Sequence, residues 1–420
     1  MHQNGAHVAP LALDLARWAA DLQPTPQDLE LADRSLLDTV AVTVAASDHP
    51  IRDVVEQLPE AARWATLGHV LDFDDLHLES TTHISVVCVP AVLAAGGDAR
   101  AYLAAAGVMA RLGTALGWPH YSSGWHATCT AGAPAAAAGA AVALGLDAEG
   151  IACAMALAVP AAGGVQRAFG TSAKSLQVGF AADAGVRAAR LAAAGASADP
   201  TALDQWLGLV GGDASRLELS GPAVPGGLAI KVFPCCYALQ RPISALRELL
   251  RSGVGADDIE RVVLRMPAGT VQPLIHPRPT TGLQSKFSLE YSVAAAVLDD
   301  YPGFASFTDD AVRRPSAADL VERVQVEKTE GGDWLLAGSL DVELVLRDGS
   351  VRTTTMTMPS GSPARPPTAV EMAAKVDDCA GPRSPELQRL TWGDAASYLR
   401  ATLGATGSGA RVPVGAGGGR

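Results

Sequence analysis

Side chains that can move protons or bind anions gather in a few short segments of a chain in which only 18% of residues are charged. Imidazole and carboxyl groups exchange protons near neutral pH, and lysine and arginine bind carboxylates. Such a set predicts acid–base chemistry on a small anion held in a cationic cleft. The candidates are Asp72, His77, His83, His126, Lys174, Gln177, Lys231, Gln240, Arg241, Lys286 and Tyr291.

The overall charge narrows the class of partner. The chain has 420 residues and a net charge of −12. Nucleic-acid binding requires clustered Lys and Arg, and the sequence has no such cluster, so we expect no nucleic-acid partner. Its six cysteines form no CxxC pair and no short, even spacing, which argues against a disulfide framework or a zinc site.

Targeting signals are also missing from the sequence pattern. The first residues have no basic segment before an apolar stretch, so we expect a cytoplasmic protein. The apolar stretch 131–146 consists mainly of Ala and Gly, which is typical of closely packed buried helices and not of a membrane span.

Other catalytic classes have weak support. No HExxH motif is present, although Asp72, Asp75 and His77 could gather a divalent ion; we predict no metal and no other cofactor. Segment 163–170 is neither GxGxxG nor a phosphate-binding loop. There is no GxSxG motif, and segment 171–174 resembles SxxK only weakly.

The elements that must position these residues are mostly helical in the first half. Leu11, Leu15, Trp18 and Leu22 recur at helical spacing, and Thr25-Pro26 is typical of a helix start. Further helices are predicted near 90–118, 129–146, 149–163, 174–195 and 201–210.

The pattern changes after the Gly/Pro-rich segment 220–227. A helix over 241–251, a strand over 259–266 and a hairpin over 340–358 follow, with Asp348-Gly349 predicting a type I′ turn. After a second Pro-rich linker at 359–367, helices are predicted near 368–379 and 384–403.

These elements predict a mainly α protein, with a smaller α+β domain inserted into a large all-α domain. We place the helical domain at residues 1–222, the α+β domain at 223–365, returning helices at 366–403 and a disordered tail at 404–420.

Five motifs, in order, resemble the MmgE/PrpD family over roughly residues 9 to 300. They are Leu-Asp-Phe-Asp-Asp with a following His, Gly-Trp-His with Thr-x-Thr, Phe-Gly followed by Ala-Lys-x-Leu, Lys-x-Phe-Pro-Cys-Cys, and Lys-Phe-Ser-Leu-x-Tyr. The resemblance implies a helical domain, a smaller α+β lid, a homodimer and no metal. It also implies action on small di- or tricarboxylic acids by dehydration of 2-methylcitrate, decarboxylation of cis-aconitate or epimerisation of iminodisuccinate.

The resemblance further implies five catalytic positions. His126 is expected to transfer a proton at carbon, Lys174 to anchor a carboxylate and stabilise an enolate, and Tyr291 to deliver a proton. Asp72 is expected to orient a histidine or to hold a hydroxyl. His83 is expected to act as a second acid or base, or to donate a hydrogen bond to a carboxylate.

The remaining candidates are predicted to contact the substrate: His77, Gln177, Lys231, Gln240, Arg241 and Lys286. Asp74 and Asp75 are interpreted as helix-capping carboxylates. Three positions depart from the family dehydratases, which commonly have Thr at Leu76 and His at Gln177 and Gln240.

The predicted reaction is dehydration of a substrate like 2-methylcitrate, with decarboxylation or epimerisation as alternatives on the same scaffold. A protein that only binds a carboxylate, or serves as a structural partner subunit, is the alternative of another class.

Overall fold

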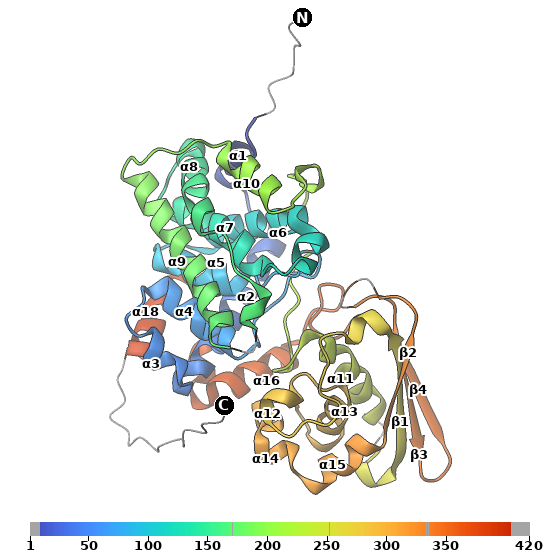
Figure 1. The fold of residues 1–420 in the computed structure, drawn as a ribbon. Coiled ribbons are helices and arrows are strands. Elements are labelled where there is room, and N and C mark those ends of the chain that lie inside the picture. Colours follow the sequence, from blue (N-terminus) through green and yellow to red (C-terminus); the bar gives the residue numbers. More distant parts are fainter. Residues whose placement is uncertain (1–8, 170, 252, 333, 335, 405–420) are drawn as a thin grey trace, which may run out of the picture.

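The computed structural model describes residues 9–169, 171–251, 253–332, 334 and 336–404 (Figure 1). It is mainly helical with one four-stranded sheet, which confirms the predicted mainly α class. The predicted tail lies outside the described residues, apart from Gly404. In the described part of the chain, no helix combines the length and apolarity needed to cross a membrane.

The buried apolar side chains form two large clusters. The first, which we call the helical core, draws on residues between 11 and 228 and between 376 and 403. Its helices are α1 Leu11–Asp21, α2 Pro26–Ala45, α3 Ile51–Val55, α4 Glu60–Val70, α5 Ser85–Ala94, α6 Ala99–Ser122, α7 Ala127–Ala143, α8 Ala148–Ala158, α9 Ala173–Ala193, α10 Ala202–Leu209, α16 Ala369–Ala380, α17 Ser384–Leu387 and α18 Trp392–Gly404.

The second cluster, the sheet core, draws on residues between 232 and 356. Its helices and strands are α11 Tyr237–Leu250, α13 Leu289–Leu298, α14 Asp309–Val312, α15 Pro315–Glu322, β1 Ile259–Pro267, β2 Val324–Thr329, β3 Leu340–Leu346 and β4 Val351–Met356. The short helix α12 Gly282–Ser285 lies against α14.

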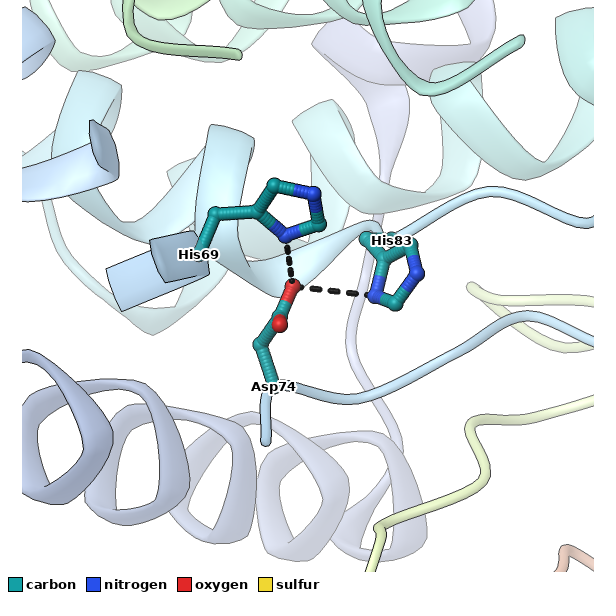
Figure 2. Close-up of side chains that lie close together, drawn as sticks. All are labelled: His69, Asp74 and His83. Atoms are coloured by element: carbon teal, nitrogen blue, oxygen red, sulfur yellow. Dashed lines mark hydrogen bonds and ion pairs between the residues drawn. The ribbon is translucent and has the colours of Figure 1, made fainter. Parts of the chain in front are cut away.

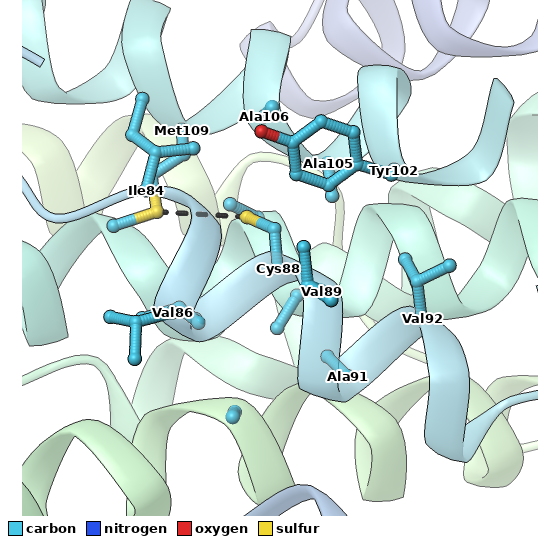
Figure 3. Close-up of a cluster of buried hydrophobic side chains, with 14 of the residues drawn as sticks. Ile84, Val86, Cys88, Val89, Ala91, Val92, Tyr102, Ala105, Ala106 and Met109 are labelled. Atoms are coloured by element: carbon cyan, nitrogen blue, oxygen red, sulfur yellow. Dashed lines mark hydrogen bonds between the residues drawn. The ribbon is translucent and has the colours of Figure 1, made fainter. Parts of the chain in front are cut away.

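Small residues set the spacing of the helical core. Figure 3 shows Ala105 and Ala106 of α6 beside the apolar side chains of α5, where Cys88 also contacts Met109. A Cβ at Gly185 of α9 would lie only 2.4 Å from the Cβ of Ala136 of α7. Because neither position has room for a larger group, α7 and α9 pack at close range, which holds the ends of both helices in fixed positions.

Local signals explain where the predicted helix limits were right and wrong. Thr25 caps α2 in a capping box with Asp28, as its residue type indicated. The stretch 90–118 is not one helix, because α5 ends before Gly96 in the left-handed region and Asp98 caps a new helix, α6. Similarly, 384–403 divides into α17 and α18, and α8 ends at Ala158, ahead of Pro160.

The sheet has the strand order β2-β1-β3-β4, with β1 parallel to β2 and antiparallel to β3. Figure 1 shows α11 and α13 lying against one face of this sheet. In β1 the side chains of Val262, Leu264 and Met266 are buried on the face that α11 and α13 cover. Val263, on the other face, is buried as well, so the strand does not follow a strict period of two.

The β3–β4 hairpin was predicted correctly, but its turn type was not. A type I′ turn requires positive φ at both central residues, and Asp348 does not have it. Instead the N–H of Gly349 donates to the carbonyl of Leu346, and Leu346 donates to Ser350, so four residues connect the strands. Gly349 alone takes the left-handed conformation, with φ of 85°.

Chain segments far apart in sequence meet around the acidic run 72–75. Figure 1 shows α16 and α18, in red, beside the N-terminal helices, and both contact α2. The ammonium of Lys375 in α16 lies 2.5 Å from Asp38 of α2, and both side chains are fully buried. Two backbone hydrogen bonds of 2.8 Å join Leu76 to Ala229, which brings the segment after Ala229 next to the acidic run 72–75.

Candidate active site

A cavity of about 240 Å³ lies where residues of the two cores meet. Five of the predicted site residues line it: Asp72, His83, His126, Lys174 and Lys231. The rest of its wall is mostly aromatic or apolar and comes from Leu76, Thr81, Trp118, Tyr121, Phe169, Cys236, Tyr237, Pro273 and Phe287. The structure therefore gathers charged and proton-carrying groups in a partly apolar enclosure, as expected of an active site for a small acid.

Three of these residues stand at the N-terminal ends of helices that pack on one another. His83 lies two residues before α5, His126 immediately before α7, and Lys174 is the second residue of α9. The N-terminal end of a helix carries a partial positive charge and unpaired N–H groups. This end of the helical core therefore favours an anion even before its lysines are considered.

Asp72 joins the two lysines of the cavity. Its carboxylate lies 2.8 Å from the Lys174 ammonium and 3.3 Å from that of Lys231, which also donates to the Asp72 carbonyl at 2.6 Å. Burial alone would raise the pKa of Asp72, but the two ammonium groups lower it well below its usual range. Burial likewise opposes the charge of Lys174, and Asp72 reverses that effect and raises the lysine pKa.

The backbone at Asp72 is also unusual. Its φ is 56°, in the left-handed region that side-chain-bearing residues rarely adopt. In the described part of the chain the other non-glycine residue with positive φ is Thr81, which also lines the cavity. Strained backbone of this kind is concentrated at functional sites, where the surrounding structure holds it in place.

Asp74 bridges two histidines at the wall of the cavity, as Figure 2 shows. One carboxylate oxygen accepts a hydrogen bond of 2.8 Å from Nδ1 of His69, and Nδ1 of His83 lies 2.9 Å from the same oxygen. Burial, opposed by Asp74, lowers the pKa of His69 to about 4, so this ring is neutral at pH 7. Asp74 itself stays ionised, because the two imidazoles outweigh its burial and lower its pKa.

This arrangement corrects two expectations. Asp74 is not a helix cap, and it is Asp74, not Asp72, that orients a histidine. His69 was missed, because a single histidine in the last turn of an apolar helix is most often a core residue, and nothing in the sequence shows that it faces Asp74. Asp75 stands at no helix end of its own; it accepts the backbone N–H and the hydroxyl of Ser85, the first residue of α5.

Gln177 controls the proton position on His126. The Gln177 amide oxygen accepts the N–H of Val165 at 3.1 Å, which directs its NH₂ group to Nδ1 of His126 at 2.7 Å. Nδ1 is therefore an acceptor, and the ring proton sits on Nε2. Burial, followed by the neighbouring His69 and Lys174, lowers the pKa of His126 well below 6.5, so the ring is neutral. Gln177, which was predicted to contact the substrate, therefore contacts His126.

Besides Gln177 and Lys286, four predicted residues do not belong to the described lining of the cavity. The Tyr291 hydroxyl donates to the Ser306 carbonyl at 2.6 Å inside the sheet core, so it is placed to stabilise that core and not to deliver a proton. Arg241 is fully buried and donates to carbonyl groups of the sheet-core loops, at Leu336, Gly338 and Thr357.

The other two act on backbone next to the cavity. The Gln240 amide accepts the N–H groups of Val232 and Phe233, each at 3.1 Å, and so fixes the segment that carries Lys231. The His77 ring binds the Ser80 hydroxyl and the Pro225 carbonyl, each at 2.7 Å. The polar atoms of both side chains form hydrogen bonds that hold these loops, so neither side chain reaches the cavity.

Lys286 is a neighbour of the site. Its ammonium donates to the Leu71 carbonyl at 3.2 Å, and burial, partly offset by Asp72, lowers its pKa. The adjacent Phe287 lines the cavity. Lys286 therefore adds positive charge close to Asp72, although its side chain is not part of the described lining.

Tyr237 is the main residue of the cavity wall that sequence reasoning missed. It is 3% exposed, and its hydroxyl has no hydrogen-bond partner among the described residues. A buried hydroxyl without a partner costs free energy, so this group is available to a bound ligand. The neighbouring Cys236 is a poor nucleophile, because burial raises the pKa of its thiol to about 11.

Metal ligation has one possible location in the described residues. Ligand atoms of His69, Asp74 and His83 lie within 4.8 Å of one another. Nδ1 of His69 is hydrogen-bonded to one oxygen of Asp74, and Nδ1 of His83 lies 2.9 Å from the same oxygen without making a hydrogen bond. The group considered from the sequence does not assemble: Asp72 pairs with lysines, Asp75 with Ser85, and His77 with Ser80.

Two family models and several known proteins match the sequence of this chain. The model of the MmgE/PrpD N-terminal domain matches residues 55–211, and that of the C-terminal domain matches residues 233–395. A cis-aconitate decarboxylase of Aspergillus terreus (strain NIH 2624 / FGSC A1156) is 26% identical over 83% of this chain and 85% of its own length. Cis-aconitate decarboxylases of Mus musculus and Homo sapiens are 29% and 27% identical over 48% of this chain and 44% of theirs. The resemblance seen in the five motifs is thereby confirmed, and the chain belongs to the MmgE/PrpD family.

Proposed function

We propose that this protein is a lyase that removes carbon dioxide from a small unsaturated di- or tricarboxylic acid of the cis-aconitate type. The observation that carries the proposal is the meeting of Lys174, Lys231, His83 and His126 in one enclosed cavity. The names of the relatives favour decarboxylation over the dehydration of 2-methylcitrate that the sequence motifs suggested first.

Binding requires cations that are held in place before the substrate arrives. Asp72 holds Lys174 and Lys231 side by side, and Lys231 is only 2% exposed. Carboxylates of the acid can approach these ammonium groups and the N-terminal ends of α5, α7 and α9. Because the cations are already positioned, little reorganisation is needed during reaction.

In the chemical step the bond between carbon and one carboxylate breaks, and carbon dioxide leaves. The electron pair of that bond moves into the remaining unsaturated carboxylate, giving an enolate-like anion. Lys174 and Lys231 stabilise its new negative charge, and the neutral His126 donates a hydrogen bond from Nε2 to an oxygen of the anion. A proton must then be added at carbon to complete the product.

We assign that proton to His83, with Asp74 as the positioning residue. Asp74 occupies the Nδ1 side of the ring, which leaves Nε2 for the cavity. The His83 ring is 13% exposed, so it can be reprotonated from water, whereas His126 is 2% exposed. This differs from the prediction that His126 transfers the proton, because Gln177 and burial hold His126 as a neutral donor.

The test is proton NMR of the purified protein in deuterated buffer, with cis-aconitate, 2-methylcitrate, citrate and iminodisuccinate offered separately. We expect cis-aconitate to lose carbon dioxide and to gain one deuterium at carbon. Loss of water from 2-methylcitrate without any decarboxylation would replace the proposal by the dehydratase. Deuterium exchange with inversion of iminodisuccinate would indicate the epimerase, and no reaction by a folded protein would favour the binding-only alternative.

The remaining expectations from the resemblance are also proposals. We infer that the residues around the sheet core act as a lid over the cavity and that two copies form a homodimer. Light scattering on the purified protein measures the second point directly, and a monomeric mass would contradict it.

A further inference from the structure

A second cavity, of about 510 Å³, adjoins the catalytic one. Thr81 and Trp118 line both, so the two spaces share a wall. We propose that this second cavity is a substrate-binding arm that accepts an apolar substituent of the acid whose carboxylates bind at Lys174 and Lys231. The inference rests on the proposed function and deepens it by naming the substrate class: acids that carry an extended alkyl or similar apolar group.

The walls of the arm continue an apolar surface that begins in the catalytic cavity. Leu76 and Tyr237 line the catalytic cavity and belong to one buried cluster with Leu336 and Ala229. Leu78 and Met358, which line the arm, pack against that same cluster. An alkyl chain leaving the catalytic cavity along this surface would therefore stay in contact with apolar side chains.

The charges of the two spaces differ. The catalytic cavity holds two lysines against one aspartate, Asp72. The charged residues in the described lining of the arm are Glu79 and Arg216, one of each sign. The catalytic cavity therefore attracts an anionic head, whereas the arm offers no excess of positive charge to a further carboxylate.

The junction between the spaces is rigidly built. Thr81, a β-branched residue, has φ of 54°, and its hydroxyl donates to the Ser80 carbonyl at 2.6 Å. The Ser80 hydroxyl in turn binds the His77 ring at 2.7 Å and the Thr82 hydroxyl at 2.6 Å. A strained residue held by a buried hydrogen-bond network is expected where position matters, and here it separates the acid-binding space from the arm.

Two side chains of the catalytic cavity suit a substrate with one polar and one apolar end. Leu76 gives the catalytic cavity an apolar contact within the cluster that leads to the arm. The Tyr237 hydroxyl, buried and without a described partner, can donate to an oxygen of the acid. The ring of the same residue packs in the apolar cluster that leads to the arm.

The experiment measures binding of methyl-, butyl- and hexylmaleate to the full-length protein by isothermal titration calorimetry. Each methylene buried in the arm is expected to tighten binding about threefold, and so about 30-fold from methyl to butyl. Ala364→Phe fills the arm from an exposed position outside the catalytic cavity. We expect this variant to lose most of the gain with chain length while binding methylmaleate within about twofold of wild type.

Ala318→Phe, at an exposed position of α15, is the matched control and should keep the wild-type series. Thr114→Phe fills the arm from a different wall and should reproduce the effect of Ala364→Phe. The proposed arm would be contradicted if affinity did not change with chain length. It would also be contradicted if both filling variants kept the increase in affinity from methyl- to butylmaleate.

Failure of the proposed function gives a different result. If methylmaleate binds but cis-aconitate is not decarboxylated, the reaction is wrong while the chain-length series still decides the arm. If the enzyme decarboxylates cis-aconitate and analogues with methyl and butyl groups at equal kcat/KM, the reaction stands and the arm is wrong.

Discussion

Nδ1 of His83 lies 2.9 Å from a carboxylate oxygen of Asp74, and that oxygen also accepts a hydrogen bond from His69. The pair fixes which nitrogen of His83 faces the cavity, as carboxylates do for histidines in other enzymes. We expect Asp74→Asn to lower kcat about 100-fold or more, because the amide NH₂ can oppose the Nδ1 proton.

Steady-state kinetics over pH 5 to 9, with circular dichroism to check folding, measures this effect. The role is positional, so the pH profile should change shape along with the loss of rate. Unchanged kcat in a folded Asn variant, or a rise in KM alone, would remove Asp74 from the proton path.

Lys174 is expected to bind both ground state and transition state. Lys174→Ala should raise KM for cis-aconitate at least tenfold and lower kcat about 100-fold, since the enolate charge loses a neighbouring cation. His126→Ala should lower kcat by a similar factor through loss of the Nε2 donor. Near wild-type turnover by both variants would contradict the whole site assignment.

The Gln177 contact predicts a change in the proton position on His126. Gln177→Glu has nearly the same shape but offers a carboxylate oxygen to Nδ1, so the proton is expected to move from Nε2 to Nδ1. We expect kcat to fall about 10- to 100-fold. Nitrogen-15 NMR of labelled histidine reports the tautomer, and a wild-type His126 spectrum in the Glu variant would show that Gln177 does not set it.

His69 predicts a pH dependence of stability. Its folded pKa is about 4, below the unfolded value near 6.5, so the unfolded state binds more protons between these values. The free energy of unfolding should therefore increase steadily from about pH 4 to about pH 6.5. The contribution of His69 to this increase is up to about 3 kcal/mol.

His69→Gln keeps a donor for Asp74 and removes the titration. Urea unfolding at pH 4.5 and 6.5 should show a smaller difference for this variant than for wild type. Equal pH dependence in the two proteins would mean that His69 is not the group responsible.

Substitution of Tyr291 tests whether this residue stabilises the sheet core and takes no part in proton transfer. Tyr291→Phe removes the hydrogen bond to the Ser306 carbonyl and leaves the ring in the sheet core, so we expect about 1 kcal/mol of lost stability. Turnover of cis-aconitate should stay within about twofold of wild type, because the hydroxyl is not in the described lining of the cavity. A large loss of kcat with normal stability would restore Tyr291 to the mechanism.

The sequence by itself determined the local elements and the family. The Thr25-Pro26 start of α2, the small-residue helices α7 and α9, and the hairpin of β3 and β4 follow from propensity and periodicity, which act over a few residues. The ordered motifs also identified the family, and five of the residues predicted from them line the cavity.

Only the tertiary structure decided which side chains meet. Gln177 faces His126 because helices distant in sequence pack at close range, and Tyr291 faces Ser306 because its helix contributes to the sheet core. His69 faces Asp74 because the buried chain turns back after α4, at Asp72 with its positive φ. The hydrogen-bond partner and pKa of a buried group depend on these non-local contacts. The spacing of residues along a chain does not contain that information, which is why the motifs located the site but not the roles within it.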